Sequence, residues 1–128
     1  MKTDLKTDGP HSPEYTAEVA DAAAEAIRVL NHATGGTEAL TYPNDVDRLI
    51  SVLETLASRL PQLFDQIQAN LVRITSAPGL YDDRGHDPAT TVAGVSMGLG
   101  AARGAAAMLH DVLNAAHQAS SHLGVHSG

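Results

Sequence analysis

The apolar residues of this chain recur at every third or fourth position in three separate segments, and this spacing strongly restricts the fold. Residues spaced in this way lie on one face of an α-helix, whereas a half-buried strand alternates apolar and polar residues. No segment of the sequence shows that alternation. We therefore predict an all-α protein in which helices over about 13–34, 45–75 and 88–122 form an antiparallel bundle of three long helices within residues 12–123.

Local signals indicate where these helices begin and end. Ser12-Pro13 and Asp87-Pro88 each combine an N-cap residue with a proline at the first helical position. Asn44 or Asp45 is expected to cap the second helix, and Gly35-Gly36 to end the first by adopting the left-handed conformation. The loop between the second and third helices contains Pro78-Gly79 and Arg84-Gly85, which are typical of turns.

Pro61 lies inside the second predicted helix. An interior proline removes one backbone hydrogen bond and collides with the preceding turn, at a cost of about 3 kcal/mol. The apolar stripe nevertheless continues through this position in the same phase, which favours one helix kinked at Pro61. The alternative is a helix split at Pro61, which would give four helices. The residues expected to form the core are Val19, Ile27, Leu30, Leu49, Leu53, Leu56, Leu60, Phe64, Ile67, Leu71, Leu99, Leu109 and Leu113.

Composition restricts the location and the partners. Residues 1–11 are polar and aperiodic, so we expect a disordered N-terminal tail, and residues 124–128 a frayed C-terminus. No secretory signal is recognisable, and the apolar stretch from Ala89 to Ala102 is shorter than the ~20 residues of a membrane span, so a cytoplasmic protein without a membrane segment is expected. The net charge of -7 makes nucleic acid an unfavourable partner.

The unequal lengths of the predicted helices favour self-association. At ~1.5 Å per residue the helices measure roughly 30, 45 and 50 Å, so the first cannot cover the other two along their whole length. The apolar strip left uncovered would be buried in a homodimer, although an unidentified protein partner is also possible. Small residues in the last helix permit close approach of another backbone. The interface candidates are Gly94, Gly98, Leu99, Ala102, Ala105 and Leu109.

Neither a metal nor a cofactor is expected. The chain has no Cys, and its row of acidic residues on the first helix, from Glu14 to Glu25, flanks the apolar stripe as a solvated face does. His122 and His126 are spaced for metal binding on a helix, but Gly124 between them makes a preformed site unfavourable. The sequence also allows a further function, the binding of a small ligand in a pocket near Pro61, where glutamines 62, 66 and 68 supply amides.

Arg103 and His110 lie seven positions apart on one side of the last predicted helix. An Arg followed closely by a His late in a helical bundle resembles the motif of HEPN-type ribonucleases and nucleotidyl-transferring toxins, in which two motifs meet across a dimer. The resemblance implies that Arg103 holds a phosphate and His110 moves a proton. Gly104 stands where that motif has a polar residue. A HEPN-like ribonuclease is therefore the alternative function.

Most of the chain also resembles small, Ala-rich helical proteins of high-GC actinobacteria. The resemblance lies in its Ala-rich composition, its preference for Arg over Lys and segments such as EVADAAAEAIRVLNHAT and LPQLFDQI. It implies an accessory or regulatory role and no activity. We therefore predict a non-catalytic interaction module, homodimeric and without catalytic residues of its own.

Overall fold

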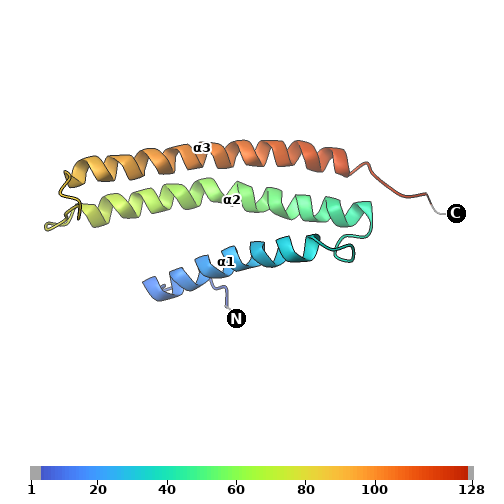
Figure 1. Cartoon of the computed structure of the whole chain (residues 1–128), viewed down its shortest axis with the longest axis horizontal. Helices are drawn as coiled ribbons and strands as arrows, with labels where there is room; N and C mark the ends of the chain where they lie inside the picture. The colour runs from blue at the N-terminus through green and yellow to red at the C-terminus, as the bar shows by residue number, and fades with distance from the viewer. Residues whose placement is uncertain (1–3, 127–128) are drawn as a thin grey trace. The chain divides into compact units, whose positions relative to one another are not determined.

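The computed structural model describes residues 4–126, and within this range it contains three helices and no strand. These are α1 (Pro13–Thr34), α2 (Pro43–Thr75) and α3 (Pro88–Ser120), shown in Figure 1. The all-α prediction is confirmed. The chain divides into two units, residues 1–41 with α1 and residues 42–128 with α2 and α3, and each unit is described by itself.

The start of α1 follows the predicted cap. The Ser12 hydroxyl accepts a hydrogen bond from the Tyr15 backbone N–H at 3.0 Å, and Pro13 occupies the first turn. The preceding segment contacts this turn, because the Tyr15 hydroxyl donates to the carbonyl oxygen of Asp4 and accepts from the N–H of Lys6 at 2.8 Å. Residues 4–11 are therefore non-helical but tied to α1. Residues 1–3 of the predicted tail lie outside the described residues.

The C-terminal end of α1 differs from the prediction. The helix stops at Thr34 as expected, but Gly35 has a φ of -72° and remains right-handed. Its N–H donates to the carbonyl of His32 at 3.3 Å, so a tightened last turn ends this helix. None of the residues of α1 is buried, and Ile27 and Leu30 are 40% and 36% exposed. Their assignment to the core was wrong.

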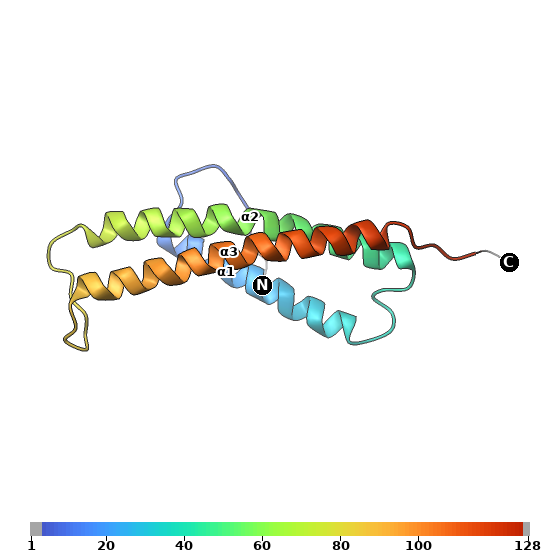
Figure 2. The ribbon, with the colours of Figure 1, turned by 90° about the horizontal axis from the view of Figure 1, so that it is seen from above.

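Helices α2 and α3 form an antiparallel hairpin joined by residues 76–87 (Figures 1 and 2). The helix α2 begins at Pro43, so the predicted cap at Asn44 or Asp45 was wrong. Tyr42 is the N-cap residue, and its N–H donates to the Asp45 carboxylate at 2.9 Å. The acidic side chain thus satisfies the start of the helix from its third position rather than from the cap.

Pro61 lies within α2, which is one uninterrupted helix from Pro43 to Thr75. The alternative of a helix split at this residue, with four helices in total, was wrong. A kink at Pro61 remains a prediction. Since its flanking turns carry the same apolar stripe, the packing of that stripe stabilises the helix despite the missing backbone hydrogen bond.

Small residues form the centre of the seam between α2 and α3. Among the described residues Ala57, Ala106 and Ser120 are buried, with exposed fractions of 0%, 5% and 7%. Larger side chains at heptad intervals from these alanines are half-buried, and they are Ile50, Phe64 and Leu71 on α2 and Val92, Leu99 and Leu113 on α3. A seam between two helices cannot enclose a wide core. Three further core predictions were wrong, because Leu56, Ile67 and Leu109 are 41%, 43% and 43% exposed.

The loop of residues 76–87 is organised by Asp82. Its carboxylate accepts hydrogen bonds from the Arg84 N–H at 2.8 Å, from the Arg84 guanidinium at 2.7 Å and from the Thr91 hydroxyl. These hydrogen bonds hold the pKa of Asp82 well below its usual value. Asp87 caps α3 as predicted, accepting from the Ala89 N–H at 3.1 Å. The helix ends at Ser120, two residues before the predicted limit.

Candidate functional site

The two flanks of the α2–α3 seam differ in chemistry. On one flank, here called the polar side, side chains from the two helices meet through hydrogen bonds. Gln68 Nε2 donates to Ser96 Oγ at 2.7 Å, and Arg103 Nε lies 2.9 Å from both carboxylate oxygens of Asp65. The heptad positions that line this side are Asp47, Glu54, Pro61 and Gln68 on α2 and Ser96, Arg103, His110 and His117 on α3.

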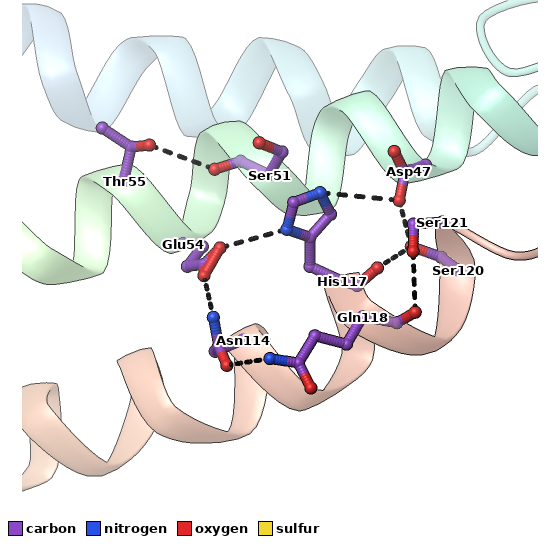
Figure 3. Close-up of polar contacts among 9 residues, drawn as sticks. All are labelled: Asp47, Ser51, Glu54, Thr55, Asn114, His117, Gln118, Ser120 and Ser121. Atoms are coloured by element: carbon purple, nitrogen blue, oxygen red, sulfur yellow. Dashed lines mark hydrogen bonds and ion pairs between the residues drawn. The ribbon is translucent and has the colours of Figure 1, made fainter.

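A carboxylate–histidine cluster occupies the polar side where the start of α2 meets the end of α3 (Figure 3). His117 Nδ1 lies 3.3 Å from Glu54 Oε1, and His117 Nε2 lies 3.7 Å from Asp47 Oδ1. Ser120 Oγ donates to Asp47 Oδ1 at 2.5 Å, and Asn114 Nδ2 donates to Glu54 Oε2 at 2.8 Å. Asp47 and Glu54 are therefore each contacted by two side chains of α3.

The cluster alters the ionisation of Glu54. The hydrogen bond from Asn114 lowers the pKa of Glu54, and the nearby His117 lowers it further, against the opposing effect of partial burial. The ionised carboxylate is therefore the form that this arrangement favours. The sequence prediction missed the cluster, although Asp47 and Glu54 are seven residues apart at matching heptad positions. That spacing could have indicated that the two carboxylates lie on the same face of the second helix.

The opposite flank of the seam carries no charged side chain. Heptad positions on this flank of α2 are Val46, Leu49, Leu53, Leu56, Leu60, Leu63, Ile67, Asn70 and Ile74, and those on α3 are Val95, Gly98, Ala102, Ala105, Leu109, Val112, Ala116 and Ala119. The polar columns of both helices meet on one side of the hairpin, so the apolar positions of α2 and α3 lie together on the other side. We call this set of apolar positions the apolar face.

Large side chains of the apolar face are open to solvent. Their exposed fractions run from 39% for Val46 to 57% for Ile74. The others in this group are Leu56, Leu63, Ile67, Val95, Leu109 and Val112. At ~25 cal/mol per Å², the free energy of burying a whole Val, Leu or Ile side chain corresponds to roughly 60–120 Å² of apolar surface. Eight half-exposed side chains therefore present on the order of 400 Å² of apolar surface. Monomeric proteins rarely expose a larger continuous apolar patch.

The predicted interface residues lie in three different places. Gly98, Ala102, Ala105 and Leu109 belong to the apolar face, and Gly94 lies at its edge. A Cβ atom added at Gly94 or Gly98 would contact nothing within 4 Å, so the hairpin itself does not require glycine there. Leu99 instead packs in the seam, half-buried. The residues of α2 that share the face were not among the predicted interface residues.

The structure places Arg103 and His110 on the polar side. The Arg103 guanidinium is paired with Asp65, and His110 Nδ1 lies 3.3 Å from the carboxylate of its neighbour Asp111. Two helical turns separate the positions of Arg103 and His110. Both residues of the proposed catalytic pair thus already contact acidic side chains.

The other candidate groups do not converge on a site. In the described part of the chain, no group of three or more His, Asp or Glu side chains is arranged to hold a metal ion. On α1, Glu25 pairs with Arg28 at 2.5 Å, which lowers the pKa of Glu25, and Glu14, Glu18 and Asp21 are exposed. Near Pro61, Gln68 is bound to Ser96, and glutamines 62 and 66 are exposed at other positions around α2.

Helix α3 is long and apolar enough to cross a membrane, judged by length and composition alone. It contains an 18-residue stretch with a mean hydropathy of 1.3, and 6% of that stretch is buried. Its apolarity comes largely from alanine and glycine, which also suit close packing against another helix.

No family model matches the chain, no curated protein matches it in sequence, and no solved structure matches it.

Proposed function

We propose that this protein is a non-catalytic interaction module that forms a homodimer through the apolar face of its α2–α3 hairpin. The observation that supports this proposal is the uncharged apolar face, which extends along both helices. Exposed apolar area of this extent is stable in water when another apolar surface covers it. An accessory or regulatory role, exerted through association, follows from such a module.

A second copy is the occupant that fits this face. Two hairpins that stack face to face form a four-helix bundle related by a two-fold axis, so each apolar column meets the same columns of the partner. Gly98, Ala102 and Ala105 on α3 let the helices approach closely. The eight large exposed side chains present on the order of 400 Å², about half of the ~800 Å² per partner of a standard interface, and the half-buried leucines and the alanines of the face add to this area.

The charge distribution supports the same choice. Residues 42–128 carry five basic and eight acidic side chains, a net charge of -3, and none of them belongs to the apolar face. Two copies that meet through this face keep their charged groups in solvent and avoid burying like charges. An anionic lipid surface, by contrast, would be repelled by the net charge.

The ribonuclease alternative receives less support from the geometry. Arg103 and His110 lie on the polar side, so they would face away from each other in a dimer that joins two apolar faces. Cleavage across a dimer needs the two motifs to converge. The alternative predicts RNA cleavage that is lost in the double variant Arg103→Ala, His110→Ala, whereas an interaction module cleaves no RNA in either form.

Light scattering across protein concentrations tests the homodimer. We expect the mass of a dimer, about 27 kDa, because one chain has a mass of 13.3 kDa. The variant Leu56→Glu places a charge on the apolar face and should give monomers. Val72→Glu is the matched control, since Val72 is 52% exposed on the same helix but lies toward the polar side. A strict monomer at all concentrations would contradict the proposal.

A further inference from the structure

The two ends of the α2–α3 hairpin are held by different means. At one end residues 76–87 connect the helices covalently, and Thr91 of α3 donates to Asp82 in that loop. At the other end, where α2 begins and α3 ends, no loop joins the two helices within residues 4–126, and residues 42–44 and 123–126 line a shallow hollow there. The carboxylate–histidine cluster lies at this open end, as Figure 3 shows.

The geometry of the cluster depends on the proton content of His117. A protonated imidazole has N–H groups on both nitrogens, and each nitrogen here faces a carboxylate of α2, Glu54 through Nδ1 and Asp47 through Nε2. A neutral imidazole has one N–H and one lone pair. One carboxylate would then face a lone pair at 3.3 or 3.7 Å, and an attraction would become a repulsion.

We propose that Asp47, Glu54 and His117 form a proton-dependent clasp that closes the open end of the hairpin when the imidazole is protonated and loosens it when the imidazole is neutral. Histidine is the side-chain type that ordinarily changes charge between pH 5 and 8, so this is the interval in which the clasp is tested. The clasp belongs to the hairpin of a single chain and does not require the proposed homodimer.

The other charged groups near the cluster leave this dependence intact. On α2, Asp47 and Glu54 are the ionisable groups that contact His117, whereas Asp45 interacts with the backbone of Tyr42. On α3, His110 lies one heptad away and adds a smaller attraction to Glu54, and its own neighbour is the exposed Asp111.

The neutral hydrogen bonds set how far the loosened end can open. Asn114 still donates to Glu54, and Ser120 still donates to Asp47, whether His117 is protonated or neutral. The end of the hairpin therefore frays more often without unfolding. Because His117 and Asp47 are 31% and 25% exposed at their side chains, solvent screens the attraction, and the effect is a modest one.

Hydrogen exchange of backbone amides between pH 5.5 and pH 8, corrected for intrinsic rates, measures this fraying. We expect the protection of residues 114–120 to fall roughly three- to tenfold over this range, as a charge-assisted contact of partly exposed groups implies. Amides of residues 96–103, nearer the connected end, should change little and serve as the internal reference. The experiment is run on wild type and on Leu56→Glu, so a dimer cannot account for the result.

Substitutions at His117 separate the clasp from a merely structural role. His117→Arg carries a permanent charge and should keep the protection high at pH 8, whereas His117→Asn should remove the pH dependence. His122→Asn, which alters a histidine just beyond α3, should behave like wild type. The proposal is overturned if protection in wild type is the same at both pH values, or if His117→Asn retains the wild-type pH dependence.

Discussion

Replacing Leu109 by Ala separates the stability of the hairpin from the stability of the proposed homodimer. Leu109 lies on the apolar face and is 43% exposed in one chain. The substitution removes three carbon atoms, worth about 0.8 kcal/mol each when fully buried. Since somewhat more than half of the side chain is already buried, the hairpin should lose about 1.4 kcal/mol. That loss is smaller than the 2.7–5 kcal/mol typical of a fully buried leucine.

The remaining exposed part of Leu109 becomes buried only when a second copy covers it. Each copy should then lose about 1 kcal/mol at the interface, or about 2 kcal/mol per dimer, which raises the dissociation constant roughly 30-fold. Urea unfolding at low protein concentration measures the first effect, and sedimentation equilibrium measures the second. Val72→Ala is the control that should leave the dissociation constant unchanged. A Leu109→Ala chain that is destabilised but keeps the wild-type dissociation constant would show that Leu109 does not lie in the interface.

Three further predictions concern the hairpin and its ends. Ala57→Leu should destabilise the chain by about 1–3 kcal/mol in urea unfolding, because Ala57 is completely buried in the seam and has no space for a larger side chain. Asp87→Ala should cost about 1 kcal/mol, seen as a lower midpoint of thermal unfolding, because it removes the N-cap of α3. Asp82 has its pKa held below the unfolded value by Arg84 and Thr91, so its contribution to stability is present above the unfolded pKa and is lost as the pH falls. Urea titrations from pH 6 to pH 2 should therefore show a shallower acid loss for Asp82→Asn, and an unchanged slope would contradict this account.

Local interactions explain which structural predictions succeeded. Ser12 and Asp87 cap their helices as expected, because capping depends on groups two or three residues away. Tyr42 was not predicted as a cap, since the deciding interaction comes from Asp45 inside the helix. Gly35 was expected to be left-handed, but the last turn of α1 tightened instead. Several endings of a helix have nearly equal energy, and a glycine permits more than one of them.

The candidate site was less predictable than the fold. Ala102 and Leu109 were expected at an interface, and they lie on the apolar face, but Leu56 and Leu63 of the same face were not named as interface candidates. All of these residues belong to broad apolar stripes. Periodicity identifies such a stripe but does not indicate which of its columns a neighbouring helix covers.

Local sequence patterns specify the three helices, most of their limits and the absence of alternating strands among the residues that the structure describes, because these features depend on residues within a few positions of one another. The tertiary structure decided which column of each stripe turned inward. Ala57 and Ala106 are both buried in the seam, while the polar columns meet on one side of it and the larger leucines of the stripe lie on the other. The pairing of Asp47 and Glu54 with His117, about 60 to 70 positions away in the chain, follows from that choice of packing. This pairing cannot be predicted from neighbouring residues, because it depends on the register between two helices.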